Sequence, residues 1–307
     1  MRRGLEEEGL RYFPPLVVVE VKALACEIPL ESGVPLSRFS IGELRREVIE
    51  RGIVASVGTT TIWRWLSQDA INPWRSRSWI FPRDPDFTEK AGRVLDLYEG
   101  MWEGKQLSKR DFVVSADEKT SIQARIRKHP TTPASPGRRM RVKHEYTRGG
   151  SLANLAALDV HRSCIFGRCE QRSGIEPFDR LVSQVMESQP YCSAKRVFWI
   201  IDNGSSHRGD KSIKRLRKIW KNIVPVHLPV HASWLNQIEI YFSVVQRKVL
   251  TPNDFASLEE VVEKRLLGFQ QRYEEIAQPF EWRFTCKDLE GLMRKIEERD
   301  ESLLKAA

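Results

Sequence analysis

A run of five apolar residues, 197–201, ends directly on Asp202, Asn203 and Gly204. A short apolar run bounded by turn residues is typical of a strand that is buried on both faces. A carboxylate at the end of such a strand costs free energy unless a cation or another partner compensates it. Asp-Asn-Gly is also a strong turn sequence, so for this tripeptide alone an ordinary turn is the simpler interpretation.

Two further acids have similar settings. Asp117 follows the apolar residues 112–114, and Glu239 lies between two isoleucines in a segment with helical periodicity. Each alone has an ordinary explanation, as a strand-end ion pair or as a salt-bridged helix residue. The three acids are separated by 84 and then 36 residues. Carboxylates are the ligands that Mg²⁺ prefers, and two such ions promote phosphoryl transfer, so together the acids indicate a metal site.

From residue 110 onward, apolar runs and amphipathic segments alternate. Their order is three strands, a helix, a strand, a helix, a strand and a helix, which predicts an α/β domain with a mixed sheet. This is also the order of an RNase H-like fold, although the order alone fits several folds. The expected strands are residues 111–117, 151–160, 164–171, 196–202 and 223–229, and the expected helices are 175–188, 211–223, 233–249 and 258–276.

The first 80 residues are expected to form short helices. Ser40 and Glu43 form a capping-box pattern at the start of one helix, and Gly52 suits its end. A second helix is expected over residues 59–71, with Trp63 and Leu66 facing inward. Two short helices around a glycine-containing turn are typical of a helix-turn-helix, but an ordinary helical hairpin remains an alternative.

Cations and hydroxyls gather in three places that suit DNA contact. One is the start of the second helix and the aromatic, cationic stretch after it. Another is the basic, proline-rich segment 122–144, expected as a loop, for which a solvated surface is the alternative. The third is the basic helix of residues 211–221, for which both interpretations stay open. The candidate DNA contacts are Thr59, Thr60, Arg64, Arg75, Arg77, Arg125, Arg127, Arg138 and Arg139.

The composition limits the class of protein. Lys and Arg number 50 against 41 Asp and Glu, for a net charge of +9, which favours a polyanionic partner or simply aids solubility. The five cysteines are irregularly spaced and do not form a zinc motif. No apolar run approaches the roughly 20 residues of a membrane span. We therefore expect a cytoplasmic, nucleoid-associated protein with no membrane partner.

Three stretches carry a resemblance to a known family: SADEKTSIQAR, FWIIDNGSSHRG and HASWLNQIEIYFSVVQRKVL. With them the chain, from about residue 16 to 290, resembles bacterial insertion-sequence transposases of the mariner-like DDE superfamily. The resemblance implies a catalytic domain like those of RNase H and retroviral integrases. It assigns Asp117, Asp202 and Glu239 as catalytic acids that hold two Mg²⁺ ions, with Mn²⁺ as a possible substitute. Asn203, His207 and Asn236 would support these acids.

The expected architecture is an α/β, RNase H-like, mixed five-stranded sheet with flanking helices. A small all-α helix-turn-helix domain, winged-helix-like, would precede it. The expected divisions are residues 1–80 for DNA binding, 81–109 as a linker helix, 110–275 as the catalytic domain and 276–307 as a helical tail. Gln237 replaces the proline usual in the family, and only one helix-turn-helix is clear. The start is therefore expected to be a shortened reading frame.

The function implied by the resemblance is that of a DNA transposase. It would bind the double-stranded terminal inverted repeats of a mobile element with TA targets, and act as a homodimer in the DNA complex. It would cleave DNA with metal ions and join strands in cut-and-paste transposition. Two alternatives are a catalytically idle DNA-binding regulator derived from a transposase, and an RNase H-like nuclease without strand joining.

Overall fold

The computed structural model describes residues 13–76, 82, 84–204 and 209–306. The chain divides into two compact units, Met1–Ile80 and Phe81–Ala307. No helix in the described residues has the length and apolar character that crossing a membrane requires.

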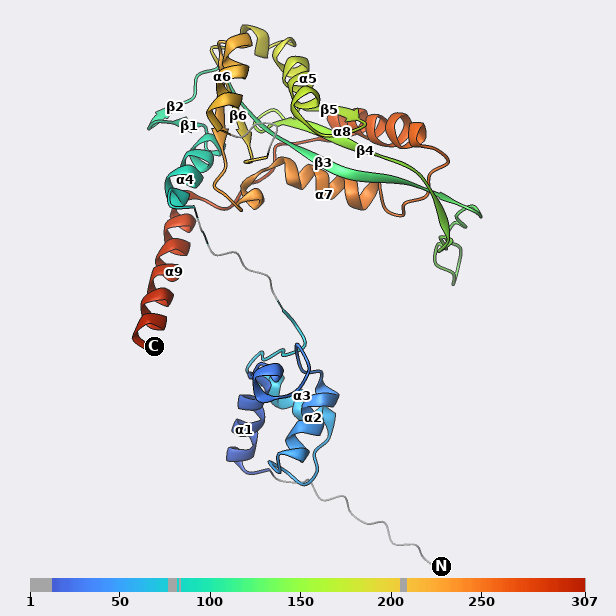
Figure 1. Cartoon of the computed structure of the whole chain (residues 1–307), viewed down its shortest axis with the longest axis vertical. Helices are drawn as coiled ribbons and strands as arrows, with labels where there is room; N and C mark the ends of the chain where they lie inside the picture. The colour runs from blue at the N-terminus through green and yellow to red at the C-terminus, as the bar shows by residue number, and fades with distance from the viewer. Residues whose placement is uncertain (1–12, 77–81, 83, 205–208, 307) are drawn as a thin grey trace, which may run out of the picture. The chain divides into compact units, whose positions relative to one another are not determined.

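The first unit is a group of three helices (Figure 1). They are α1 (Pro15–Ala25), α2 (Ile41–Glu50) and α3 (Thr59–Gln68), with the 3₁₀ turn η1 (Pro29–Ser32) between the first two. The capping box is confirmed: Ser40 Oγ accepts from the Glu43 N–H, and the Glu43 carboxylate accepts from the Ser40 N–H at 2.8 Å. Gly52, at φ +70°, follows the end of α2 in the left-handed conformation. Residues 13–76, the described part of this unit, contain helices and no strand, so they show no β wing.

The expected inward face of α3 is partly wrong. Ile62, Trp65 and Leu66 are buried against α1 and α2, whereas Trp63 is 51% exposed. Residues 62, 65 and 66 follow the i, i+3, i+4 spacing of one helix face, and position 63 lies about 100° away from Ile62. The exposed face of α3 therefore carries an aromatic ring beside its polar residues.

The second unit is built on a five-stranded sheet in the order β5-β4-β3-β6-β7. The strands are β3 (Asp111–Arg127), β4 (Tyr146–Asp159), β5 (Ile165–Glu170), β6 (Arg196–Ile201) and β7 (Ile223–His227). The first three strands along the chain pair antiparallel, and β3, β6 and β7 pair parallel. The expected mixed five-stranded sheet is confirmed. A separate two-stranded ribbon joins β1 (Met101–Trp102) and β2 (Lys105–Gln106).

Helices cover both faces of the sheet (Figure 1). On one face, α5 (Ile175–Met186) and α6 (Gly209–Ile219) pack on side chains such as Val114 and Trp199. On the other face, α7 (Ile238–Lys248) and α8 (Gly268–Ile276) pack around Ile122 and Leu158. Farther along that face, α4 (Phe87–Tyr98) and α9 (Cys286–Ala306) pack around Phe198. The remaining elements are the π-helical segment η4 (Glu260–Leu267) and the 3₁₀ turns η2 (Tyr191–Ser193) and η3 (Ser233–Leu235).

One strand boundary differs greatly from expectation. The sequence predicts a strand that ends at Asp117, but β3 continues to Arg127 and pairs with β4 along this length. The polar residues after Asp117 form an irregularity in the ladder, and alternation of buried and more exposed residues resumes at Ile122. The expected loop of residues 122–144 is therefore a strand end followed by a shorter hairpin connection, residues 128–145.

Candidate active site

The sheet brings Asp117 and Asp202 to neighbouring positions. The parallel pairing of β3 with β6 ends at Ser115 and Ile200, and each aspartate lies two residues farther along its chain. Asp117 is 8% exposed and Asp202 is partly buried. Their carboxylates accept backbone hydrogen bonds, from the N–H of Glu118 to Asp117 Oδ1 and from the N–H of Gly204 to Asp202 Oδ1, both at 2.7 Å. The parallel register therefore places one carboxylate in β3 and the other directly after the neighbouring strand β6.

A buried polar network attaches the start of α7 to the same part of β3. The Asn236 amide donates to the carbonyl of Ala116 at 3.2 Å and to Asp117 Oδ2 at 3.1 Å. The Ser115 hydroxyl donates to Asn236 Oδ1 and accepts from the Ile238 N–H at 3.0 Å. Asn236 is only 1% exposed. Glu239 lies in the first turn of α7, so this network fixes the start of the helix that carries Glu239 relative to Asp117.

The three acids influence one another electrostatically. The pKa of Asp117 is raised to about 7, mainly by burial and also by the negative charges of Asp202, Glu118 and Glu239, whereas the hydrogen bond from the Glu118 N–H opposes the rise. The pKa of Glu239 is also raised, first by desolvation and then by Asp202, whereas Lys119 opposes the rise. A site that resists the accumulation of negative charge is one in which a bound cation is stabilising.

The donor set suits a hard divalent cation. All three groups are carboxylates, which Mg²⁺ and Mn²⁺ prefer to sulfur or imidazole ligands. No group of three Asp, Glu, His or Cys side chains in the described residues is already gathered as a metal site. The acids thus lie within electrostatic range without converging on one point. In charge and ligand type they fit the expected ions.

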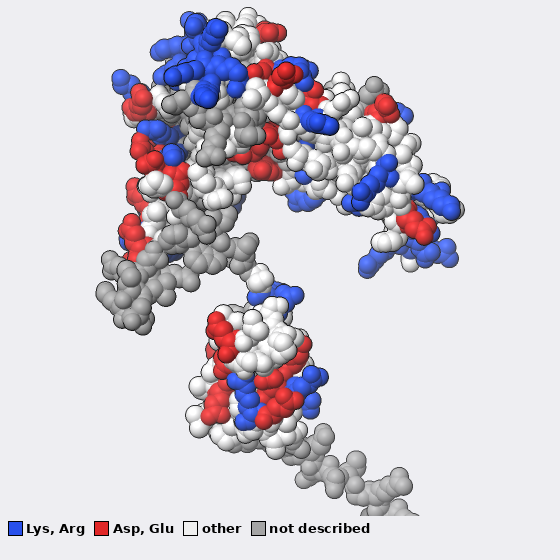
Figure 2. All heavy atoms as spheres, in the orientation of Figure 1, with Lys and Arg blue, Asp and Glu red and all other residues white. Residues whose placement is uncertain are grey.

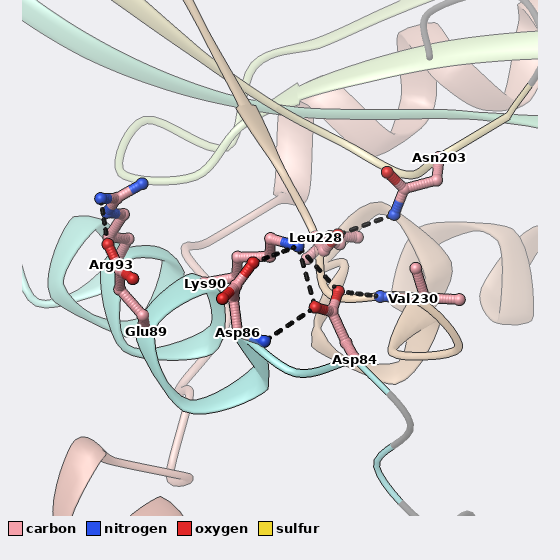
Figure 3. Close-up of polar contacts among 8 residues, drawn as sticks. All are labelled: Asp84, Asp86, Glu89, Lys90, Arg93, Asn203, Leu228 and Val230. Atoms are coloured by element: carbon pink, nitrogen blue, oxygen red, sulfur yellow. Dashed lines mark hydrogen bonds and ion pairs between the residues drawn. The ribbon is translucent and has the colours of Figure 1, made fainter. Parts of the chain in front are cut away.

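The loop of residues 228–233, which lies beside Asp202, is held by residues from distant parts of the chain (Figure 3). The Asn203 amide donates to the carbonyl of Leu228 at 2.8 Å. Asp84 accepts from the Val230 N–H at 3.0 Å and from Lys90 Nζ at 2.9 Å. A pocket of about 410 Å³ lies between this loop and Asp202. The side chain of Asn203 thus binds the backbone of this loop and fixes the side of the pocket next to Asp202.

Asp84 carries no signal in the sequence that would single it out. Its stretch, Asp-Pro-Asp before a helix, has the composition of an ordinary helix start. The side chain is only 3% exposed, and it accepts from the Asp86 N–H as well as from Val230. Its partner in the loop is 146 residues away, and no local pattern encodes a contact over that separation.

The predicted DNA contacts fall into different environments. Thr59, Thr60 and Arg64 are exposed on α3, and Arg75 is exposed after it. Arg138 and Arg139 are exposed in the hairpin connection. Figure 2 shows Lys and Arg gathered over α6 and at the far end of the β3–β4 hairpin. Two further predicted residues, Arg77 and His207, lie outside the described residues.

Arg125 and Arg127 lie in β3 and face internal partners. Their guanidinium carbons lie 4.8 and 5.0 Å from the centre of the Tyr146 ring. Arg127 also donates to the backbone carbonyls of His144 at 2.9 Å and Asn253 at 2.8 Å. These bonds join the base of the β3–β4 hairpin to Asn253, which follows α7, so Arg127 stabilises the hairpin.

Comparison with known proteins is consistent with this geometry. Residues 112–262 match the family model described as DDE superfamily endonuclease. No curated protein matches the chain. Two similar solved structures are the Mos1 transposase paired-end complex with left transposon end and the Mos1 strand transfer complex, with TM-scores of 0.51 and 0.50. Both are 12% identical to the chain and cover 89% of it, and the chain covers 76% and 75% of them. At this identity the similarity concerns the fold, which is the RNase H-like fold expected from the sequence.

Proposed function

Because residues 112–262 match the family model described as DDE superfamily endonuclease, we propose that this chain is a DNA transposase. It binds the terminal inverted repeats of a mobile element, cleaves DNA at them and joins the freed ends to target DNA. The observation that carries this proposal is that Asp117, Asp202 and Glu239 lie within electrostatic range of one another, where desolvation and mutual repulsion raise the pKa values of Asp117 and Glu239.

Asp117, Asp202 and Glu239 would hold two Mg²⁺ ions, or Mn²⁺, and these ions would supply charge stabilisation at the phosphate that reacts. The protein's own part is positioning. Asn236 fixes Asp117 through a hydrogen bond, and the bond from Ile238 to Ser115 fixes the first turn of α7. Groups that orient a ligand carboxylate commonly alter metal affinity or activity by about 10- to 100-fold.

The proposed reaction consists of two successive displacements at phosphorus. In cleavage, a water oxygen bonds to phosphorus while the bond to the 3′ oxygen breaks, leaving a 3′-hydroxyl and a 5′-phosphate. In joining, that 3′-hydroxyl attacks a phosphodiester of target DNA, whose own 3′ oxygen departs. Both steps exchange one oxygen at phosphorus, so the same three carboxylates serve both.

DNA recognition is assigned to the exposed face of α3 and to basic surfaces of the second unit. Thr59, Thr60 and Arg64 present hydroxyls and a guanidinium of the kind that contacts phosphates and base edges. Arg138 and Arg139 extend the basic surface on the hairpin. We assign double-stranded DNA as the partner. We also propose that a homodimer of the chain holds the two ends of the mobile element.

A cleavage and joining assay tests the proposal. The substrate is the element's own end with its flanking DNA, incubated with Mg²⁺ or with EDTA. Joined strands that depend on Mg²⁺ support the transposase. Nicked products without joining favour a nuclease, and tight binding without cutting favours an idle regulator.

A further inference from the structure

The amino-terminal ends of β3, β6 and β7 lie together at the edge of the sheet opposite the candidate active site. Asp111 pairs with Arg196, and Val197 pairs with Ile223, so the three parallel strands begin at nearly the same level. Asp202 lies six residues after Arg196, which corresponds to about 20 Å along an extended strand. A ligand bound at this edge is therefore remote from the three acids.

Hydrogen bonds bring Arg110, Lys195 and Lys221 together at this edge. The Lys195 N–H donates to the carbonyl of Arg110 at 2.8 Å. The side-chain amide of Asn222, which follows Lys221, donates to the carbonyl of Ala194 at 3.2 Å. All three cationic side chains are exposed. Three segments that are far apart in the sequence thus place their cations at one edge of the sheet.

The last turn of α6 extends this cluster. The helix ends at Ile219 and β7 begins at Ile223, so the carboxyl-terminal end of α6 lies at the same edge. Lys218 is exposed in that turn, whereas Leu216 is buried beneath it. Lys and Arg side chains gather over α6 (Figure 2). We call the four cations at this edge the basal patch: Arg110, Lys195, Lys218 and Lys221.

Neighbouring acids are bound to other cations. The fully buried side chain of Asp111 pairs with Arg196 at 2.9 Å, and Asp179 of α5 pairs with Arg215 at 3.0 Å. Glu103, in the turn between β1 and β2, acts on Arg196. Among the described residues, no ion pair joins an acid to a member of the basal patch. The patch therefore presents uncompensated positive charge to solvent.

The chemistry of the basal patch fits a regular polyanion. Three of its members are lysines, whose ammonium groups contact phosphates as point charges, whereas paired donors that read base edges are typical of arginine. The guanidinium of Arg110 already donates to the carbonyl of Ser193 at 2.7 Å. Trp220, next to Lys221, packs against the core and is no platform for base stacking. The phosphate backbone of duplex DNA, recognised without regard to sequence, matches these groups.

We propose that the basal patch binds the phosphate backbone of a duplex DNA segment other than the one held at the active site. The proposal rests on the proposed function, since it takes DNA as the polyanion. Because about 20 Å of sheet separates the patch from Asp202, the patch takes no part in cleavage. It adds sequence-independent affinity and holds a second duplex while the active site holds an element end.

Binding of a labelled duplex that contains no element end, measured by fluorescence anisotropy in EDTA over a range of salt, tests the patch. The full chain is compared with the double variant Lys195→Ala/Lys221→Ala, in which both replaced side chains are exposed. The slope of log K against log salt should fall by about 1.8, since each lost phosphate contact lowers it by about 0.9. The reduction should be the same for unrelated duplex sequences.

The matched control is the double variant Lys264→Ala/Arg272→Ala. It removes the same charge from exposed positions on η4 and α8. This control should keep the salt slope of the wild type. An equal reduction in both double variants would overturn the proposal, because it would reflect the net charge of the chain and not a patch.

A capture experiment tests whether the patch holds a separate segment. The full chain, bound to immobilised element-end DNA in EDTA, should capture a labelled unrelated duplex, and Lys195→Ala/Lys221→Ala should capture much less. If the end-bound wild type captures no second duplex, the proposal is wrong even where the salt slope falls, because the patch then contacts the same segment.

Cleavage of a bound element end with Mg²⁺ separates this proposal from the proposed function. Lys195→Ala/Lys221→Ala should cleave the bound end at the wild-type rate, and loss of cleavage would overturn the proposal by placing the patch in the catalytic path. If the wild type cleaves but the double variant keeps its salt slope, the patch is wrong and the transposase stands. If the salt slope falls as expected but the wild type never cleaves, the patch stands and the enzymatic proposal fails.

Discussion

The side-chain amide of Asn236 donates a hydrogen bond to the carboxylate of Asp117 at 3.1 Å and a second to the backbone carbonyl of Ala116 at 3.2 Å. Asn236 and Asp117 are 119 positions apart in the chain. The bond joins the strand that carries the first acid to the residues that lead into the helix carrying the third, and together with the bond from Ile238 to Ser115 it sets the spacing of the site.

Replacing Asn236 with alanine should therefore affect activity more than folding. We expect a loss of about 1–3 kcal/mol in the free energy of unfolding, because buried groups lose their partners. We also expect cleavage to fall about 10- to 100-fold. Chemical denaturation and a cleavage assay at equal folded fraction measure the two effects.

The matched control is Asn222→Ala. Asn222 also donates to two backbone carbonyls, those of Tyr191 and Ala194, away from the acids. It should lose comparable stability and keep its cleavage rate. Equal loss of activity in both variants would mean that Asn236 acts only through the fold.

Divalent cations should stabilise the wild type. Because the charges of Asp202 and Glu239 help to raise the pKa of Asp117, a cation that binds the folded state relieves repulsion and raises the melting temperature. Asp202→Asn removes part of that repulsion, so it should melt no lower than the wild type in EDTA and gain less from Mg²⁺. Thermal denaturation with and without Mg²⁺ measures this; an equal gain in both proteins would argue against a metal site at Asp202.

Asp84 should prove essential to the loop beside Asp202. Asp84→Ala leaves the N–H groups of Asp86 and Val230 without their acceptor, which should lower the free energy of unfolding by about 1–3 kcal/mol. Asp86→Ala is the control, since Asp86 is 59% exposed and its pair with Lys90 is 3.4 Å long; exposed pairs contribute about 0–1 kcal/mol. Equal effects by urea denaturation would contradict the anchoring role of Asp84.

The pair of Asp111 and Arg196 predicts a pH dependence of stability. Hydrogen bonds from Arg196, and then from Ser108, hold the pKa of Asp111 well below its ordinary range. A folded-state pKa below the unfolded one contributes stability that is present above about pH 4 and is lost as the pH falls through the folded-state pKa. Asp111→Asn should thus be less stable than the wild type at pH 7, and the difference should shrink below about pH 4. A difference that stays constant from neutral pH to strongly acidic pH would contradict this.

The control for that pH series is Glu176→Gln. Glu176 is 89% exposed, and its ion pair with Arg180 is 3.9 Å long. Such a pair contributes little to stability. Its unfolding curve should follow that of the wild type at every pH.

The order of strands and helices in the second unit could be predicted from the sequence because each element has a clear apolar period. The apolar residues 197–201 form β6 and are buried, and Asp202 follows them as expected. The length of β3 could not be predicted in this way. The polar residues after Asp117 look like a turn, and only pairing with β4 shows that the strand continues past a bulge.

Side-chain partners were the least predictable part of the site. Arg127 lies in a basic segment of the sequence, which favours a DNA contact. In the structure its guanidinium donates to the carbonyl of Asn253, 126 residues away. Trp63 faces solvent because Trp65 occupies the inward position. In both cases the outcome depends on tertiary contacts that no local pattern encodes.

We assign Asp202 to the reactive centre of the enzyme and not to a simple turn. The most direct test compares Asp202→Asn with the wild type for binding and for Mg²⁺-dependent cleavage of the same element-end DNA. We predict that the variant binds with the affinity of the wild type and does not cleave. Cleavage by Asp202→Asn at the wild-type rate would contradict the assignment of the site.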